Sequence, residues 1–423
     1  MGYKSIKTKL YLSEHERNFI LIIMRTSKHL YNQALYNVRQ HYFDTGKFLS
    51  YEDNYMMLSR ESENYRLLST SQGQAVIKKV DEAMKAFFGS IKSKLTKNVK
   101  LPRYLEKNGY FPLFDRMVYK PCADNYVMPR GNFIKKVSKE LEDIYQKTMK
   151  HDLSIEPIKS LNIKIETPRC ITHKKIKEIT IREKYDGKYI EVIHTYVEDS
   201  ISTNNLLKPE TMSIDLGLIN LAYTAVSNGN HLLVDGLKLK SMNQFYHKKI
   251  ASLSSTRPNQ KILTKQMIKL IEKRNNQMTY GIHKAARLII NHAIQNNVGH
   301  IIIGVSDFKD SILKDTYQQW ASSIPIARLR HRIHELALEN GIRTEEVNEA
   351  YTSKASYIDG DLIEKGIFSG KRTKRGLYVS QEGIKINADL NAALNIYKKG
   401  KPDAERIGTK GWNTPKRTYL FGM

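Results

Sequence analysis

Residues 211–226 read Thr-Met-Ser-Ile-Asp-Leu-Gly-Leu-Ile-Asn-Leu-Ala-Tyr-Thr-Ala-Val, an apolar run that contains one carboxylate, Asp215. Such a run predicts a buried strand, and a carboxylate within one costs free energy unless another group pairs with it. Gly217 allows a backbone or a ligand to approach closely. The Asn-Gly pair at 228–229 predicts a tight turn, and residues 231–235 then return as a second strand.

A strand that carries one acid and runs into a hairpin is typical of the start of ribonuclease-H-like nuclease domains. The alternative for the same residues is an ordinary core strand with an aspartate at its solvent end. Asp215 is therefore a candidate catalytic residue, and a nuclease would need further acids beside it.

The composition favours a nucleic-acid-binding protein. The 423 residues include 69 Lys plus Arg against 43 Asp plus Glu, a formal net charge of +26. Such an excess of positive charge suits a polyanion, for which nucleic acid is the usual identity. Ribosome-like basicity and binding to a membrane surface are the alternatives. A chain of this length has room for two to four domains.

Several other classes of protein are excluded by the sequence. No apolar run approaches the roughly 18 residues of a membrane-spanning helix, and we expect no membrane partner. The first residues, Met-Gly-Tyr-Lys-Ser-Ile-Lys, lack the apolar core of a signal peptide. The two cysteines, Cys122 and Cys170, lie far apart, which excludes a disulfide framework and a four-cysteine zinc site. We expect a soluble intracellular protein.

A small all-helical lobe is predicted over residues 13–96. Ser13-Glu-His-Glu16 spells a capping box, with the serine at the cap and the glutamate three residues on. Apolar periodicity then predicts three helices, over about 13–43, from residue 50, and over about 72–94. An ordinary helical bundle explains this pattern as well as a functional lobe does.

Short strands punctuated by proline surround that lobe. Residues 3–12 alternate weakly as one strand, and residues 176–183 and 189–197 form a predicted hairpin around an Asp-Gly turn. Together these segments predict a small β-barrel made of 1–12 and 97–205, with the helical lobe inserted between. Residues 206–209 are the expected linker to the domain of Asp215.

A long helical region is predicted over about 240–297, with a break near Arg257-Pro258. Lysines recur there every four residues, on one helix face, at Lys261, Lys265, Lys269 and Lys273. Like charges at this spacing repel by roughly 0.2–0.5 kcal/mol per pair. Binding to phosphates therefore explains them better than solubility does, although an ordinary solvated face is the alternative.

Further basic residues and another candidate acid follow. A short buried strand is predicted over 299–304, a helix with Arg328 and Arg332 over 326–340, and a strand over 342–348 that ends at Glu349. Residues 350–386 are the least regular part of the chain. They contain a predicted phosphate-binding loop with the basic residues Lys371, Arg372, Lys374 and Arg375.

Asp389 lies in the first turn of a helix predicted over 387–398. Its ordinary explanation is a charge that suits a helix N-terminus. The functional explanation is that it folds back beside Asp215. Hydrolysis of a phosphodiester by two Mg²⁺ ions needs a bridging carboxylate with further carboxylates around it, and hard oxygen ligands suit Mg²⁺. The basic tail, 399–423, is expected to be extended.

Two motifs resemble those of the TnpB family, transposon-associated RNA-guided DNA nucleases related to type V CRISPR effectors. Ser-Ile-Asp-Leu-Gly-Leu-Ile-Asn-Leu-Ala at 213–222 resembles the first RuvC motif, and Asn-Ala-Asp-Leu-Asn-Ala-Ala-Leu-Asn-Ile at 387–396 is similar to the third. Tyr-Thr-Ser-Lys at 351–354 resembles the stretch that enters the family's zinc ribbon. The resemblance is strong over about 211–397. It is weaker over 1–205, where it rests on architecture and on Tyr-Asn-x-Ala-Leu at 31–35.

The resemblance implies an α+β multidomain fold. An RNase H-like (RuvC) α/β domain would comprise 206–349 and 387–398, a helical REC-like lobe would be inserted in a small WED-like β-barrel, and 350–386 would bind the target nucleic acid. The implied activity is that of an RNA-guided DNA endonuclease with two Mg²⁺ ions. Its partners would be a guide RNA and target double-stranded DNA, and it would act as a monomer on the RNA, in the bacterial cytoplasm at the nucleoid. We expect contacts to a short flanking motif from Tyr51, Lys78 and Lys79.

The chain departs from the family pattern in two places. The family usually has a glutamate after the strand equivalent to 300–303, where this chain has Gly304. Some members are believed to use a relocated glutamate, and Glu349 is our candidate because it ends the next strand. An exposed strand-end acid is its ordinary explanation, and weaker candidates for the same role are Glu346, Asp307 and Asp310.

The second departure is that the cysteines of the zinc ribbon are absent. Thr352 and Ala355 cannot bind Zn²⁺ as thiolates do, so we expect no zinc. The catalytic and metal-binding set would be Asp215, Glu349 and Asp389. Two other functions stay open: a nuclease-dead, RNA-guided DNA-binding repressor, suggested by Gly304, and a DNA-strand transferase, since RuvC-like folds also serve transposases.

Overall fold

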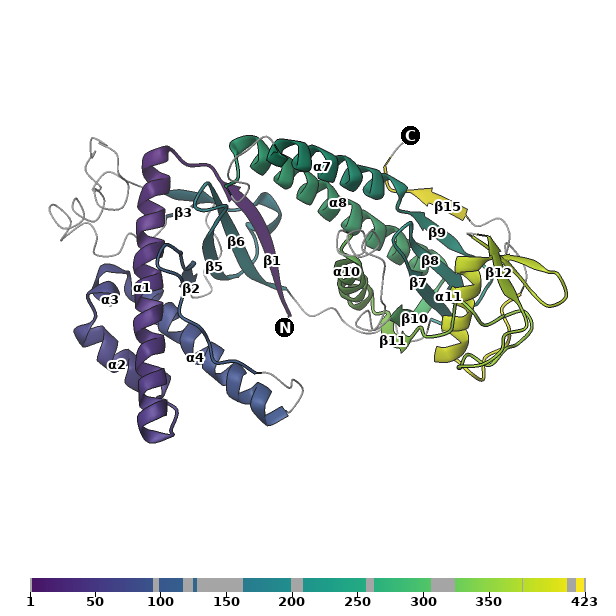
Figure 1. Cartoon of the computed structure of the whole chain (residues 1–423), viewed down its shortest axis with the longest axis horizontal. Helices are drawn as coiled ribbons and strands as arrows, with labels where there is room; N and C mark the ends of the chain where they lie inside the picture. Colours follow the sequence, from purple (N-terminus) through teal and green to yellow (C-terminus); the bar gives the residue numbers. More distant parts are fainter. Residues whose placement is uncertain are drawn as a thin grey trace. The chain divides into compact units, whose positions relative to one another are not determined.

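The computed structural model describes residues 2–93, 99–116, 125–127, 163–198, 208–255, 262–305, 324–374, 376–408 and 416–421. The chain divides into two compact units, Met1–Ser200 and Ile201–Met423. Each is a mixture of helices and sheets (Figure 1). Within the described parts, no helix is both long and apolar enough to cross a membrane.

The helices of the first unit begin close to where the sequence predicts them. They are α1 (Glu14–Thr45), α2 (Tyr51–Glu61), the short α3 (Glu63–Leu67) and α4 (Thr70–Ser93). The predicted capping box is confirmed, because the Ser13 side chain accepts from the backbone N–H of Glu16 while the Glu16 carboxylate accepts from that of Ser13. Helix α3 is not predicted by the sequence pattern.

A four-stranded antiparallel sheet packs with these helices around one hydrophobic core. Its order is β1-β6-β5-β2, with the strands β1 (Gly2–Leu10), β2 (Leu113–Arg116), β5 (Ile176–Lys184) and β6 (Tyr189–Glu198). The predicted hairpin is confirmed, and its turn places Tyr185, Asp186 and Gly187 at positive φ. The first strand joins the sheet through β6, as expected. Closure into a barrel stays a prediction.

Two small elements complete the described part of this unit. Strand β3 (Asn125–Val127) pairs antiparallel with β4 (Lys164–Glu166). A single 3-10 turn, η2 (Arg169–Ile171), precedes β5. Residues around Cys122, between β2 and β3, lie outside the described residues.

The second unit is built on a six-stranded mixed sheet of order β11-β10-β7-β8-β9-β15. Strands β7 (Glu210–Leu216), β10 (Val298–Val305) and β11 (Arg343–Asn348) are parallel to one another. The predicted hairpin around the Asn-Gly turn at 228–229 is confirmed, and it joins β8 (Asn220–Val226) to β9 (Leu232–Asp235). The single strand predicted over 211–226 is instead two strands, β7 and β8, which pair antiparallel. Gly217 accommodates a close approach, since a Cβ there would lie 2.6 Å from the carbonyl oxygen of Asn220.

Helices cover both faces of this sheet (Figure 1). The first face packs against α8 (Lys265–Gln295) and α10 (Ile326–Glu339), through sheet residues such as Met212 and Ile214. The second face packs against α11 (Ala388–Gly400), through Tyr223, Ala225 and Leu233. Helix α7 (Leu237–Ser255) precedes α8, and the predicted break between them falls partly outside the described residues.

The C-terminal region contains more regular structure than the sequence indicates. Residues 371–387 form a three-stranded antiparallel sheet of β12 (Lys371–Lys374), β13 (Leu377–Val379) and β14 (Lys385–Asn387), so the predicted basic loop is in fact a hairpin. The tail adds β15 (Lys416–Tyr419) in parallel to β9, where Arg417 forms an ion pair with the buried Asp235. The sheet edge therefore incorporates part of the tail.

Candidate active site

The geometry of the site begins with the alternation of β7. Successive side chains of a strand point to opposite faces, so Asp215 shares its face with Ser213. The Ser213 hydroxyl donates to the carbonyl oxygen of Ala393 in α11 at 2.6 Å, which fixes α11 against this face. The carboxylate of Asp215, at the carboxyl end of β7, is therefore directed to the same side as α11.

Asp389 reaches this side from the first turn of α11. Asn387 is the N-cap, and its side-chain oxygen accepts from the backbone N–H groups of Asp389 at 2.9 Å and Leu390 at 3.2 Å. The Asp389 carboxylate in turn accepts from the Asn220 amide at 2.6 Å and from the Arg372 guanidinium at 3.5 Å. Because Asn220 begins β8, next to the end of β7, the helix start is held at this end of the sheet.

Glu349 comes from the neighbouring strands. Strand β11 pairs with β10 in parallel, and one further hydrogen bond joins the Glu349 N–H to the Val305 carbonyl at 3.1 Å. A Cβ on Gly304 would lie 3.2 Å from Oε2 of Glu349. The carboxylate of Glu349 thus lies beside the position where a side chain at 304 would begin.

The three acids influence one another electrostatically. Burial and, after it, the charges of Asp389 and Glu349 raise the pKa of Asp215 to about 8, against an opposing effect of Arg372. Like charges that close disfavour ionisation of one another. Asp215 keeps some exposed surface, so a ligand can reach it from solvent. A perturbed acid at the end of a sheet is a typical functional-site feature.

Hard oxygen donors of this kind fit Mg²⁺, and a divalent cation would relieve the excess negative charge that raises the pKa of Asp215. Among the residues that the structure describes, however, no three acids, histidines or cysteines are close enough together to hold a metal ion as they stand. The donor set therefore fits the metal in chemistry, while Asn220 and Arg372 occupy the oxygens of Asp389.

Sequence reasoning misses three residues at this site, of which Asn220 and Lys399 bind its surroundings directly. Asn220 binds Asp389, and its only signal is its place within the first motif. Lys399, near the end of α11, donates to the carbonyl oxygens of Asn348 at 2.9 Å and Ala350 at 2.8 Å, on either side of Glu349. Nothing in the local pattern distinguishes this lysine from the other basic residues of the region.

Tyr223 is a third such residue. It lies directly opposite Asp215 in the β7–β8 pair, so the two side chains share a face. The ring is buried, and its hydroxyl has no hydrogen-bond partner among the described residues. Burial and the charge of Asp389 raise the pKa of this hydroxyl. A neutral hydroxyl is thereby held beside the acids.

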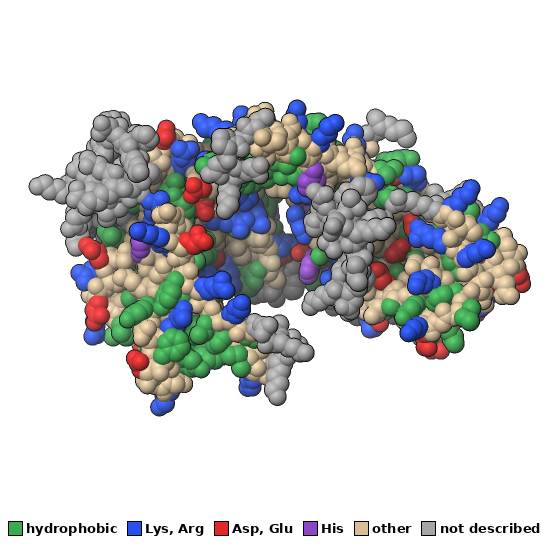
Figure 2. Space-filling model, in the orientation of Figure 1, with side chains coloured by type: hydrophobic (Ala, Val, Ile, Leu, Met, Phe, Trp, Pro, Cys, Tyr) green, Lys and Arg blue, Asp and Glu red, His purple; other side chains and the backbone are tan. Residues whose placement is uncertain are grey.

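The predicted phosphate-binding residues of the second unit differ in whether the structure describes them and leaves their side chains exposed. Three lysines of the predicted face, Lys265, Lys269 and Lys273, are exposed on α8, while Lys261 and Arg375 lie outside the described residues. Lys371, Arg372 and Lys374 are exposed on β12. Figure 2 shows Lys and Arg side chains gathered over the α7–α8 region and over the β12 hairpin.

Of the two arginines predicted on α10, Arg328 is exposed and donates to the Thr279 hydroxyl at 3.1 Å. Arg332 is instead paired with Glu335 of its own helix at 2.6 Å, and with Glu339 at 3.9 Å. Arg332 would have to break these contacts to bind a phosphate. Of the weaker acid candidates, Glu346 pairs with His334 and Arg330. Asp307 and Asp310 lie outside the described residues.

In the first unit, three residues are predicted to contact a flanking motif: Tyr51, Lys78 and Lys79. Two of them are in contact with each other, and the third has other partners. The ammonium of Lys78 lies 4.9 Å from the centre of the Tyr51 ring, which stacks on Tyr55. Lys79 instead pairs with Glu82 at 2.9 Å and lies over the Phe114 ring. Tyr51 and Lys78 are therefore brought together, and Lys79 is not beside them.

Residues 350–361 are held by hydrogen bonds to α11. Asn391 and Asn395, one turn apart and fully buried, both donate to the carbonyl of Ala355, at 2.8 Å and 2.7 Å. Asn395 also donates to Thr352, and Asn391 accepts from the Tyr357 N–H. Asparagines on the helix thus anchor the segment in which the zinc cysteines are missing.

The chain matches two family models. Residues 193–306 match OrfB_IS605, described as a probable transposase, and residues 327–396 match the Cas12f1-like TNB domain. A relative, the TnpB-like protein ORF457 of Acidianus two-tailed virus, is 26% identical over 411 residues, which cover 88% of this chain and 81% of that protein.

Solved structures give weaker likenesses. A complex of Cas12f1 with sgRNA and target DNA aligns with a TM-score of 0.34 at 16% identity, covering 94% of this chain and 99% of that one. The mini-RNA-guided endonuclease Cas_phi3 aligns with a TM-score of 0.42 at 10% identity, covering 94% and 92% of the two chains.

Proposed function

We propose that this chain, which belongs to the TnpB family, is an RNA-guided DNA endonuclease that cuts target DNA beside a short flanking motif. The observation that carries the proposal is that the charges of Asp389 and Glu349 act on the Asp215 carboxylate at one end of the large sheet. The sheet order supports a ribonuclease-H-like (RuvC) domain, because its acid-bearing first strand is central, with the hairpin on one side and parallel strands on the other.

Asp215, Glu349 and Asp389 would hold two Mg²⁺ ions. When bound, these ions activate a water and stabilise the leaving oxygen of the phosphodiester. The chain's own contribution is to place the carboxylates: β7 presents Asp215, the N-cap of α11 presents Asp389, and Lys399 fixes the backbone around Glu349. Arg372 is the cation placed to contact a phosphate next to Asp389.

A guide RNA and double-stranded target DNA are the proposed partners. The net charge of +26 supports polyanion binding, and exposed basic residues on α8 and β12 supply phosphate contacts in the domain that carries the acids. Guide pairing would read the target sequence while the protein reads the flanking motif. The wedge-like barrel, the helical recognition lobe and the bounds given from the sequence remain part of this proposal.

The experiment is plasmid cleavage in Mg²⁺ by the chain purified with its RNA. We expect cutting at a target matched to the RNA, and loss of cutting in Asp215→Ala and Glu349→Ala variants that still bind RNA and DNA. Asp403→Ala, which removes an exposed acid of the same unit, is the matched control. A wild type that binds matched DNA without cutting would overturn the endonuclease proposal.

One observation favours a second candidate, a nuclease-dead RNA-guided repressor. Gly304 stands where the family usually has its glutamate. The retention of Asp215 and Asp389, and the place of Glu349 beside Gly304, argue for the enzyme. Cleavage products that are joined to new ends, and not merely cut, would instead indicate a strand transferase.

A further inference from the structure

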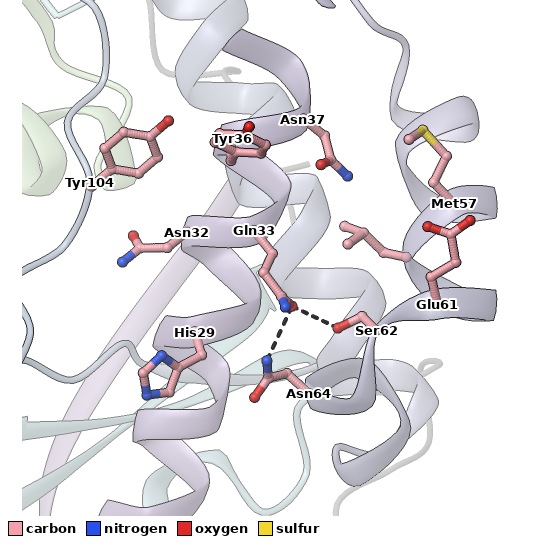
Figure 3. Close-up of a pocket in the computed structure, with 11 residues that line it drawn as sticks. His29, Asn32, Gln33, Tyr36, Asn37, Met57, Glu61, Ser62, Asn64 and Tyr104 are labelled. Atoms are coloured by element: carbon pink, nitrogen blue, oxygen red, sulfur yellow. Dashed lines mark hydrogen bonds between the residues drawn. The ribbon is translucent and has the colours of Figure 1, made fainter. Parts of the chain in front are cut away.

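A pocket of about 550 Å³ lies in the helical part of the first unit, away from any residue to which a role has been given so far (Figure 3). Its volume is within the ~300–1,000 Å³ usual for small-ligand sites. It is open to solvent, and its walls come from α1, α2, α3 and the segment around Tyr104. The lining residues that carry the inference are Gln33, Tyr36, Asn37, Glu61, Asn64 and Tyr104.

Two side-chain amides on α1 present a fixed donor and a fixed acceptor to this pocket. The Gln33 carbonyl oxygen accepts from the Ser62 hydroxyl at 2.7 Å and from the Asn64 amide at 3.1 Å, which leaves the Gln33 amine as a donor. The Asn37 amine donates to Asn54 at 3.1 Å, which leaves the Asn37 oxygen as an acceptor. Residues four apart lie on one helix face, so donor and acceptor are neighbours.

Exposed aromatic rings stand beside these amides. Tyr36 is 54% exposed and Tyr104 is 43% exposed, so both rings are accessible to a ligand. The guanidinium of Arg39 lies 4.9 Å from the centre of the Tyr104 ring and supports it from outside the pocket. Unstacked nucleobases are bound by exposed aromatic rings, on which the base stacks, together with a hydrogen-bond donor and acceptor that pair with the edge of the base.

The charge of the lining indicates which part of a nucleotide would enter. Lys and Arg are absent from the described lining, and Glu61 places a carboxylate in the wall. His29 is also in the wall, and burial together with Lys28 and Arg25 lowers its pKa, which keeps the imidazole neutral at neutral pH. A phosphate is therefore disfavoured inside, whereas a flat, neutral, polar ring is favoured.

We propose that this pocket binds one unpaired nucleobase of the guide RNA. The ring would stack on Tyr36 or Tyr104 while its edge pairs with the Gln33 amine and the Asn37 oxygen. The Glu61 carboxylate is an acceptor suited to a ribose 2′-hydroxyl, which distinguishes RNA from DNA. This inference rests on the proposed function, because that function supplies the RNA.

The test begins by sequencing the RNA that co-purifies with the protein and transcribing it in vitro as a single defined RNA. The full chain is bound to this RNA, and each base is probed with reagents that modify unpaired bases. Gln33→Glu keeps the acceptor for Ser62 and Asn64 but replaces the donor amine, and Tyr104→Ala removes the ring. The matched control is Gln40→Glu, which makes the same change on α1 outside the pocket.

We expect one unpaired base to be protected in the wild type and in Gln40→Glu. Both pocket variants should expose that base and weaken RNA binding by about 5- to 100-fold. Circular dichroism of each variant verifies that the helices have formed. Unchanged protection in both folded pocket variants would overturn the inference, as would protection that arises only when target DNA is added.

Failure of the pocket and failure of the proposed function are distinguishable in this experiment. If the wild type binds its RNA specifically and cuts DNA but the pocket variants behave like Gln40→Glu, the pocket assignment is wrong and the guided nuclease stands. If no specific RNA is recovered with the wild type, the RNA-guided function itself fails, and the base pocket fails with it.

Discussion

The carboxylate of Glu349 lies 3.2 Å from the point at which a side chain on Gly304 would begin. The same point is 2.4 Å from Cδ1 of Ile396, in α11. Space that a glutamate at 304 would need is therefore already filled by the acid of the neighbouring strand and by the packing of the helix. This relationship is the geometric support for proposing Glu349 as the third acid.

Gly304→Ala should reduce cutting, because the added Cβ pushes Ile396 and the Glu349 carboxylate from their places. Overpacking of this kind costs typically ~1–3 kcal/mol of stability. Chemical unfolding and single-turnover cleavage measure the two effects. Gly89→Ala is the control, since nothing lies within 4 Å of its added Cβ and alanine favours the helix. Equal cleavage by Gly304→Ala and wild type would count against Glu349 as the third acid.

Asp215→Asn should stabilise the metal-free chain at neutral and alkaline pH. The pKa of Asp215 is about 8 in the folded chain and near the ordinary 3.8 when unfolded. Between these values the folded state binds more protons, so stability falls as pH rises from about 4 to 8. Asparagine removes this slope, and we expect a gain of about 1–3 kcal/mol at pH 8.

Thermal and urea unfolding in EDTA, over pH 5 to 9, measure this difference. Asp403→Asn, an exposed acid of the same unit, should follow the wild type at every pH. Added Mg²⁺ should stabilise the wild type more than Asp215→Asn. If the stability of the wild type and that of Asp215→Asn change with pH in the same way, the pKa of Asp215 is not raised in the folded chain.

Arg372→Ala should slow cleavage by roughly tenfold, about 1.4 kcal/mol in activation free energy. Its guanidinium lies 3.5 Å from Asp389 and opposes the charges that raise the pKa of Asp215. Arg343→Ala is the matched control, because Arg343 is exposed at the opposite end of β11. Single-turnover rates with saturating RNA and DNA separate catalysis from binding. Equal losses in both variants would indicate a general effect of charge.

Lys399→Met should lower the cleavage rate without weakening nucleic-acid binding. The ammonium of Lys399 joins the carbonyls on both sides of Glu349, and methionine keeps much of the apolar stem without the donor. A positioning role predicts a drop of about tenfold in the single-turnover rate with unchanged binding constants. Lys401→Met, two residues further on and exposed, is the control. Weaker binding at an unchanged rate would assign Lys399 to a phosphate contact instead.

Asn395→Ala should loosen residues 350–361 from α11. It removes hydrogen bonds to the carbonyls of Thr352 and Ala355, of which Ala355 keeps the bond from Asn391, at a cost of about 1–3 kcal/mol. Hydrogen exchange of that segment and overall unfolding measure the effect, with the exposed Asn276→Ala as control. A zinc-selective chelator should leave the wild type unchanged. A chelator that reproduces the Asn395→Ala effect would show that a metal holds the segment.

Local pattern predicted the elements that depend on neighbouring residues. The capping box at Ser13 and the Asp-Gly hairpin turn are each determined within a few residues, so sequence reasoning located them correctly. It also placed Asp215 in a strand, although the single strand predicted over 211–226 is two antiparallel strands. It failed where pairing is non-local. The basic segment at 371–379 is a hairpin whose third strand ends at Asn387, and part of the tail completes a distant sheet edge.

By itself, the sequence determined which residues are candidate acids and that Asp215 lies in a buried strand, because apolar runs, caps and turns act over short distances along the chain. Only the tertiary structure decided that these acids come to one end of the sheet and influence one another electrostatically. Ser213 docks α11 on β7, Asn220 holds Asp389, and the parallel pairing of β10 with β11 brings Glu349 beside Gly304. Each of these contacts joins segments far apart in the sequence, and the electrostatic strain on Asp215 exists only once they form.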